Sequence, residues 1–372
     1  MIYMDHAATT YPHPDVIDAM QPYFDTYTHN PSASYATEEA AAVEEARALV
    51  ADFLGTEPGN LVFTAGGSEA DNLALKGVVD AIDGEHVVTT TIEHSAVVET
   101  CDWLESRGID VTRVRPGSDG RVDPADIENA IRPDTALVSV MHANNETGVI
   151  QPLAEIGAIT DDHDVLLHSD TVQSAGKIPV DVAELGLDLA SLSAHKFYGP
   201  NGVGALYVRS GVDLEPLIHG GGQEHGLRSG TENVAGLVGM GKAADLASAD
   251  MDERHSRLSK LRDEFVANVR ETTDAELIGH PEHRLPGYAM LCFPGRSGAQ
   301  LIAALADHDI AVSGGSACHS GDPSPSRVLV EMDVDPDLAM GAVRFSMGRE
   351  TTDEDVAYVT ETLQDVLHEV PA

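Results

Sequence analysis

Short apolar runs that end on polar side chains recur along the chain, and two of them stand out. Residues 165–167 lead into Asp170, and residues 187–192 lead into the segment 193–196, which ends on Lys196. Apolar runs of this length, bounded by turn residues, are typical of buried strands in a parallel or mixed sheet. Ligands bind such sheets where the carboxyl ends of the strands open into a crevice, so we expect Asp170 and Lys196 to reach one ligand from two directions.

Strand-like and helix-like patterns alternate through the first two thirds of the chain. Apolar runs typical of strands lie at 60–64, 85–92, 109–114 and 136–141, and helical spacing is found at 37–54, at 96–106 and after Pro124. This alternation predicts an α/β fold with a mostly parallel sheet covered by helices on both faces. Residues 234–270 have the spacing of long helices, and from about residue 275 the pattern restarts as a smaller α+β unit. We therefore expect a large domain over residues 13–252 and a small domain formed by 1–12 and 253–372.

Composition narrows the possible partners. The 372 residues include 62 Asp and Glu but only 22 Lys and Arg, which gives a formal net charge of −40. A charge this negative argues against binding nucleic acid or an anionic membrane through the general surface. Because apolar periodicity persists throughout, we expect a folded protein rather than a disordered acidic chain. An acidic, lysine-poor surface favours a solvent of high salt, and a halophilic cytoplasm is our hypothesis.

The sequence offers no sign of export. Residues 1–14 have neither a basic segment nor an apolar segment of the kind found in signal peptides, and no apolar stretch approaches a membrane span. The three cysteines, an odd number in a chain this long, do not form a disulfide framework and are not spaced as a zinc site. We therefore expect a soluble, cytoplasmic protein that contains no structural metal.

Polar residues follow other predicted strands as well. The strand at 60–64 runs into Gly67 and Ser68 and then into a helical stretch, and this arrangement makes a phosphate cradle from bare backbone N–H groups and a hydroxyl. His94 follows the strand at 85–92, and Asn145 lies in the polar loop after the strand at 136–141. Each of these residues also has a simpler interpretation, as a tight turn or a hydrogen-bonded polar group.

Three loops carry further candidates for ligand contacts. Asn30 is a turn former or a substrate contact, and the residues alone favour the turn. The glycine-rich loop 219–231, which contains Thr231, is a flexible linker or a second phosphate arm that reaches a neighbouring subunit. Cys318 lies in a Gly/Ser loop where packing gives no reason for a cysteine, so it is the candidate reactive thiol. Arg344 lies in a strand-like run, where charges are normally paired, and a substrate carboxylate is one such partner.

The remaining two cysteines have a different interpretation. Cys101 lies in a helical run and Cys292 in an apolar strand-like run, so we expect both of them in the core.

The pair formed by Lys196 and Asp170 suits one cofactor. A lysine amine condenses with an aldehyde to give a Schiff base, and a carboxylate holds a pyridinium N–H, so the two together fit pyridoxal 5′-phosphate. The competing interpretation is a solvated lysine and a turn-forming aspartate, which are common at strand ends.

Seven motifs along nearly the whole chain resemble the cysteine desulfurases, which are pyridoxal-phosphate enzymes that supply sulfur for iron–sulfur clusters and thiolated cofactors. The motifs are MDHAATT (4–10), FTAGGSEADN (63–72), EH (93–94), NNETG (144–148), SAHK (193–196), RSGT (228–231) and GSAC (315–318). Related class V aminotransferases share SAHK and lack GSAC, so the two together are specific. The resemblance implies the pyridoxal-phosphate fold type I, with a seven-stranded sheet in the large domain, and a homodimer.

The resemblance also implies a role for each candidate residue. Lys196 would bind the cofactor and later move the Cα proton, and Cys318 would attack the sulfur of L-cysteine, which leaves a persulfide and releases alanine. His94 would stack on the ring and act as an acid–base group. The other implied cofactor contacts are Asp170 at the ring nitrogen, Gln173 and Asn145 near the phenolic oxygen, Gly67, Ser68, Ser193 and His195 at the phosphate, and Thr231 from the other subunit. Asn30 and Arg344 would bind the substrate carboxylate.

Some features leave alternatives open. Gly67 and Ser68 replace the Ala-Thr pair common in the family, which keeps the hydroxyl, and residues 34–36 differ from the usual pattern. The sulfur acceptor, a scaffold or a tRNA-thiolation enzyme, is not identified by the sequence. The competing functions are a selenocysteine lyase, a plain aminotransferase and a non-catalytic acidic scaffold. A further alternative is a metal hydrolase, whose ligands would be Asp5, His6, His168, Asp170 and His195.

Overall fold

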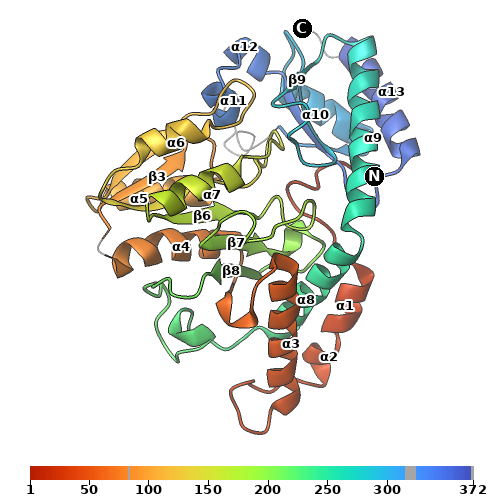
Figure 1. The fold of residues 1–372 in the computed structure, drawn as a ribbon. Helices are drawn as coiled ribbons and strands as arrows, with labels where there is room; N and C mark the ends of the chain where they lie inside the picture. Colours follow the sequence, from red (N-terminus) through yellow and green to blue (C-terminus); the bar gives the residue numbers. More distant parts are fainter. Residues whose placement is uncertain (83, 315–323, 370–372) are drawn as a thin grey trace.

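A seven-stranded sheet organises the first two thirds of the chain (Figure 1). The computed structural model describes residues 1–82, 84–314 and 324–369. The strand order in the sheet is β2-β8-β7-β6-β5-β3-β4, and β8 runs antiparallel to both of its neighbours while the other pairs are parallel. The strands are β2 (Leu61–Thr64), β3 (His86–Thr90), β4 (Asp110–Val114), β5 (Thr135–Ser139), β6 (Leu166–Asp170), β7 (Leu189–Ser193) and β8 (Gly204–Val208). The predicted mostly parallel sheet is confirmed.

Helices cover both faces of this sheet, as the alternating pattern predicts (Figure 1). Neighbouring strand residues separate to opposite faces: Leu137 belongs to one apolar core and Val138 to the other. The first of these cores is built with α4 (Gly67–Ala81) and α5 (Ser95–Glu105). The second is built with α3 (Thr37–Leu54), α6 (Pro124–Ala130), α7 (Leu153–Asp162) and α8 (Val234–Ala249). Two short helices, α1 (Pro14–Met20) and α2 (Pro22–Asp25), lie beside α8.

The last third of the chain forms a second, smaller unit around an antiparallel sheet of order β12-β10-β9. Its strands are β9 (Glu276–Ile278), β10 (Tyr288–Cys292) and β12 (Ala342–Ser346). Its helices are α9 (Met251–Thr272), α10 (Gly298–Asp307), α11 (Arg327–Glu331), α12 (Pro336–Ala339) and α13 (Asp353–Glu369). The N-terminal arm joins this unit, because β1 (Ile2–Tyr3) pairs in parallel with β11 (Ile310–Ala311). The α+β character of the unit agrees with the sequence, and the exact division at residues 252 and 253 stays a prediction.

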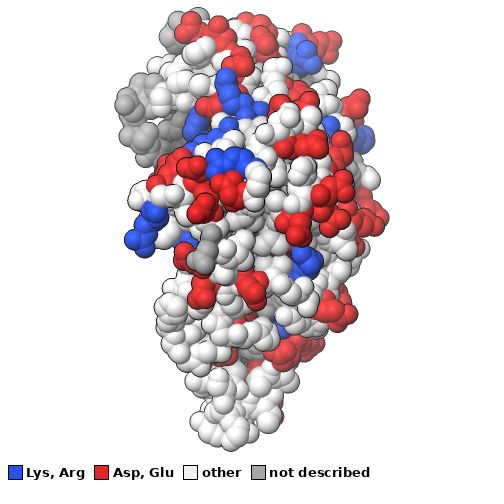
Figure 2. All heavy atoms as spheres, turned by 60° about the vertical axis from the view of Figure 1, so that its left-hand side comes forward, with Lys and Arg blue, Asp and Glu red and all other residues white. Residues whose placement is uncertain are grey.

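The surface carries the acidic excess of the composition. On the face drawn in Figure 2, Asp and Glu side chains are spread over most of the upper part, and Lys and Arg occur in small groups among them. The lower end of this face, around the segment between α2 and α3, is largely uncharged. No helix in the described part of the chain combines the length and the apolar character needed to cross a membrane.

Candidate active site

A cavity of about 250 Å³ opens where β6 and β7 end and α4 begins. Its walls are Gly67, Ser68, Asp71, His94, Met141, Asn145, Asp170, Val172, Gln173, Ser193, His195 and Lys196. The sequence predicted most of this set, since polar residues at the carboxyl ends of parallel strands meet at one edge of the sheet. Asp71, Met141 and Val172 were not predicted.

Lys196 enters the cavity from a single 3-10 turn, residues Ala194–Lys196, directly after β7. Its Nζ donates hydrogen bonds to the carbonyl oxygens of Ala7 at 2.7 Å and Ala8 at 2.8 Å, so the N-terminal arm fixes the amine. Burial, together with the positive charge of Arg344, lowers the pKa of Lys196 to about 8. Roughly a tenth of the amine is therefore uncharged at pH 7, far more than for an ordinary lysine, and this fraction is able to act as a nucleophile.

Asp170 is the last residue of β6 and is buried, rather than lying in a turn after the strand. Its Oδ1 accepts a hydrogen bond of 2.9 Å from the backbone N–H of Val172. Burial raises the pKa of this carboxyl, and the nearby His94 and Lys196 act in the opposite direction. A cationic N–H placed beside it would complete the charge pairing that a buried carboxylate requires.

The end of the cavity near α4 fits a phosphate. The first-turn N–H groups of α4 have no partners within the helix and point into this end, and the hydroxyls of Ser68 and Ser193 flank them. A Cβ atom on Gly67 would lie 2.7 Å from Cγ2 of Val172, so the Val172 side chain would have to shift to accommodate alanine at this position. His195 is held by a 3.0 Å contact between its Nδ1 and the Thr9 hydroxyl, and burial lowers the pKa of His195 to about 4, so the ring is neutral.

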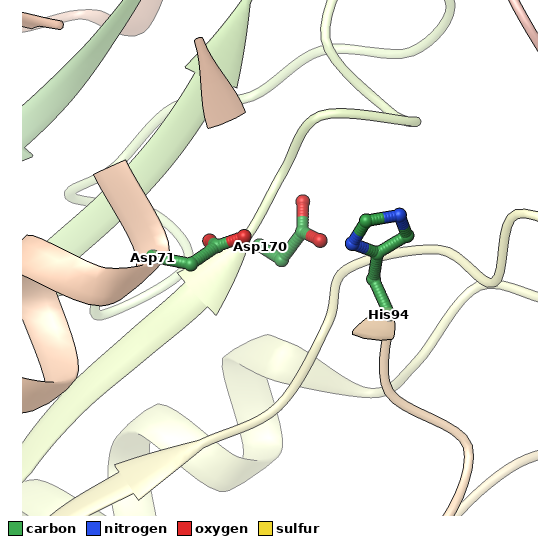
Figure 3. Close-up of side chains that lie close together, drawn as sticks. All are labelled: Asp71, His94 and Asp170. Carbon is green, nitrogen blue, oxygen red and sulfur yellow. The ribbon is translucent and has the colours of Figure 1, made fainter. Parts of the chain in front are cut away.

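The opposite wall is made by His94 and Gln173. His94 is the N-cap of α5, where its ring accepts a hydrogen bond from the N–H of Ala96, and Figure 3 shows the ring turned toward Asp170. The Gln173 amide is fixed at both ends, because it donates to the Ala7 carbonyl at 2.9 Å and accepts from the Tyr288 hydroxyl at 2.7 Å. The cavity thus offers a phosphate cradle, a lysine amine, a buried carboxylate and an imidazole, which together fit pyridoxal 5′-phosphate.

Three of the predicted residues do not line the cavity. Asn30 and Thr231 are exposed. Arg344 is buried on β12, where its guanidinium donates to Asp5 Oδ1 at 2.7 Å and to the carbonyl of Asn145 at 2.8 Å. This contact with Asn145 brings Arg344 to the rim of the site. Cys318 lies outside the described residues.

The other two cysteines lie where the sequence predicts. Cys101 on α5 and Cys292 on β10 are fully buried, and burial raises the pKa of each thiol to about 12. Both therefore stay protonated and inert.

Of the residues proposed for a metal hydrolase, Asp170 and His195 line the cavity, whereas Asp5, His6 and His168 do not. His168 is bonded through its two ring nitrogens to Ser139 and Ser191, and His6 contacts the carbonyl of Ser346. Within residues 1–82, 84–314 and 324–369, the group with metal-ligand spacing is instead Asp71, His94 and Asp170. Two of these three residues were predicted as cofactor contacts, so the structure gives no support to the hydrolase alternative.

Comparison with known proteins agrees with this geometry. Residues 2–359 match the family described as aminotransferase class-V. The chain is 44% identical over 374 residues to the cysteine desulfurase IscS of Dictyoglomus turgidum, covering 99% of this chain and 95% of that protein. It is 48% identical over 365 residues to the cysteine desulfurase IscS of Anaeromyxobacter dehalogenans, covering 96% of this chain and 90% of that protein. A solved structure described as a NifS-like protein superposes with a TM-score of 0.93 at 37% identity, covering 99% of this chain and all of the other.

Proposed function

This chain belongs to the class V aminotransferase family and is a pyridoxal-phosphate-dependent cysteine desulfurase, and we propose that it converts L-cysteine to L-alanine by passing the sulfur to Cys318. The observation that carries the residue assignment is the convergence of Lys196, Asp170 and the N-terminus of α4 on one cavity. When bound, the cofactor supplies an aldehyde for the amine and a protonated ring that takes up an electron pair from Cα.

Different residues of the cavity would bind different parts of the cofactor. The N-terminus of α4, Ser68, Ser193 and the neutral ring of His195 would hold the phosphate, and Asp170 would pair with the ring nitrogen. The Lys196 amine, with its pKa near 8, is suited to exchange a proton with Cα at neutral pH. His94 would cover the other face of the ring and limit the access of water.

We propose that Arg344 binds the carboxylate of the substrate. In the structure it is already oriented by Asp5 and by the Asn145 carbonyl, while its Nε has no hydrogen-bond partner among the described residues. A buried guanidinium N–H without a partner is costly, and a substrate carboxylate would satisfy it. Asn30 stays a proposed second contact, and Thr231 stays a proposed phosphate contact from a second subunit.

The sulfur step is a transfer between two sulfur atoms. The Cys318 thiolate attacks the sulfur of the substrate, and the bond between that sulfur and Cβ breaks. The electron pair of this bond remains with the carbon skeleton, which takes up a proton and leaves as alanine, while the sulfur stays on the enzyme as a persulfide. One thiol and one cysteine thus give one persulfide and one alanine, and no outside oxidant is needed.

The test is turnover of L-cysteine by the purified protein, loaded with pyridoxal 5′-phosphate and assayed in molar KCl. We expect alanine and, in the presence of a thiol reductant, an equal amount of sulfide. Lys196→Ala should abolish both products and leave the circular dichroism spectrum unchanged. Cys318→Ser should still shift the visible absorption on addition of cysteine but form no persulfide. Retained turnover in Lys196→Ala, or sulfide formation in Cys318→Ser at the normal rate, would contradict the proposal.

We further propose that the protein is a homodimer in a halophilic cytoplasm and passes its sulfur to an acceptor protein of iron–sulfur cluster or thiocofactor assembly. The dimer is supported by apolar side chains that this chain exposes in its first 35 residues, which include Ile17, Phe24 and Tyr35. Thr231 also supports it, since this residue is exposed and outside the cavity of its own chain. Light scattering of the protein in molar salt would decide the oligomeric state.

A further inference from the structure

A second aspartate lies beside Asp170 in the wall of the cavity. Asp71 comes from the second turn of α4, just after the phosphate cradle, and is 1% exposed. Its Oδ1 is buried and has no hydrogen-bond partner among the described residues. Figure 3 shows the carboxyl group of Asp71 directed toward Asp170, with His94 beyond it. One carboxylate oxygen from each aspartate and one ring nitrogen of His94 all lie within 4.8 Å of one another.

Two carboxylates this close in a buried site cannot both be ionised, because burial and their mutual repulsion favour one proton between them. The surroundings decide which group carries it. Asp170 faces the His94 ring and the Lys196 amine, and both lower the pKa of Asp170 and so favour its charged form. Burial raises the pKa of Asp71 most, the neighbouring Asp170 raises it further, and Glu93 has a smaller effect in the same direction.

The other neighbours of Asp71 do not change this assignment. The Nε2 atom of His168 lies 3.6 Å from Oδ1 of Asp71. Burial lowers the pKa of His168 to about 3, so its ring is neutral and supplies no positive charge. The Ser191 hydroxyl on β7 hydrogen-bonds the Asp71 carboxyl and lowers its pKa, which only partly offsets the larger effect of burial. The proton therefore resides on Asp71, the carboxyl group with the less favourable surroundings for a charge.

We propose that Asp71 is a positioning residue that stays a neutral carboxylic acid and donates a hydrogen bond to Asp170, directly or through one water. This inference rests on the proposed function, since Asp170 acts there on the ring nitrogen of the cofactor. A donor behind Asp170 stabilises its anion, so the shared proton stays on the ring nitrogen and the ring remains an electron sink. Asp71 thus acts on the reaction through Asp170.

The test uses two variants that both remove the carboxyl group. Asp71→Asn keeps a donor of nearly the same shape, and Asp71→Leu removes the donor. With ¹⁵N-labelled pyridoxal 5′-phosphate bound, we expect the ring nitrogen to stay protonated from pH 6 to pH 9 in the wild type and in Asp71→Asn. In Asp71→Leu, we expect the pKa of the ring nitrogen to fall by about one unit or more, with kcat lowered roughly tenfold and the KM for L-cysteine little changed. Asp188→Asn is the matched control. Asp188 is also a buried carboxylate, but it lies at the end of β6 and β7 opposite to Asp170.

A second measurement does not need Asp71→Leu to fold. The infrared difference spectrum between the wild type and Asp71→Asn, both loaded with cofactor at pH 7, should contain the C=O stretch of a neutral carboxylic acid. A carboxylate band in its place would overturn the proposal, as would an unchanged ring nitrogen in Asp71→Leu or an Asp71→Asn that behaves like Asp71→Leu. If the wild type loads the cofactor but makes no alanine from L-cysteine, the proposed function is wrong. The ¹⁵N and infrared measurements would still test the protonation of Asp71 in that case.

Discussion

At the scale of single residues, the ionisation of Lys196 gives the clearest prediction. The pKa of its amine is lowered to about 8, so the amine is mostly protonated below that pH and mostly free above it. Only the free amine attacks the cofactor aldehyde. We expect the rate of cofactor binding to the cofactor-free protein, followed by visible absorbance, to rise about tenfold per pH unit below pH 8 and to level off above it.

The cause of the lowered pKa can be tested separately. Arg344 contributes to it through its positive charge, so Arg344→Gln should move the midpoint of the pH profile to higher pH. Lys260→Gln, which removes an exposed lysine on α9, should leave the midpoint unchanged. A binding rate that does not depend on pH between 6 and 9 would rule out the assigned ionisation.

The residues that the sequence could predict are those at strand ends. Lys196 and Asp170 follow apolar runs, and the topology of a parallel sheet brings such ends together without any knowledge of side-chain packing. Asp71 could not be found in this way, because a polar residue inside a helical stretch is usually solvent-exposed. Its burial depends on how α4 packs against β6 and β7, which is a property of the tertiary structure. The pairing of Arg344 with Asp5 could not be predicted from the sequence either, because the two residues are 339 positions apart.

At the scale of elements, the sequence predicted whether each main segment is a helix or a strand, but it predicted the first and last residues of these elements less well. The apolar run at 165–167 is only the first part of a strand that continues through Asp170, because the strand interior also accommodates His168, which is bonded to two serine hydroxyls. The loop 219–231 was open to two interpretations, a linker and a phosphate arm. In the structure it is anchored by a buried ion pair that sequence periodicity does not reveal.

This anchor joins the loop to α3 and β2. The Glu224 carboxylate accepts two hydrogen bonds from the Arg47 guanidinium, at 2.9 and 2.8 Å, and one of 2.8 Å from the N–H of Phe63. Both charged side chains are at least 94% buried. Because Glu224→Gln leaves the buried charge of Arg47 with only the exposed carboxylate of Glu44 as a counter-ion, we expect it to lower the free energy of unfolding by roughly 3–5 kcal/mol.

Urea denaturation in molar salt, followed by circular dichroism, measures this effect. The control is Glu264→Gln, which breaks the exposed pair of Glu264 with Lys260 and should not move the midpoint measurably. If Glu224→Gln unfolds at the same urea concentration as the wild type, the ion pair does not anchor the loop in the way described.

At the scale of the whole molecule, the composition predicts how the stability depends on salt, which no single contact determines. The formal net charge is −40, and on the upper part of the face drawn in Figure 2 the carboxylates outnumber the basic groups among them. At low ionic strength these charges repel one another over a long range, and this repulsion opposes the compact state more than the expanded one. Salt at molar concentration shortens the range to about 3 Å, so only neighbouring charges still interact.

We therefore expect the midpoint of thermal unfolding to rise as KCl is increased from dilute buffer to molar concentration. Sodium sulfate and KCl should be compared at equal ionic strength, since sulfate also strengthens apolar burial while both salts screen charge. A rise in both salts is the result expected of screening, and a rise in sulfate alone would assign the effect to burial of apolar surface. Unfolding as KCl is raised would refute the halophilic hypothesis, and cysteine desulfurase activity would then have to be sought in dilute buffer.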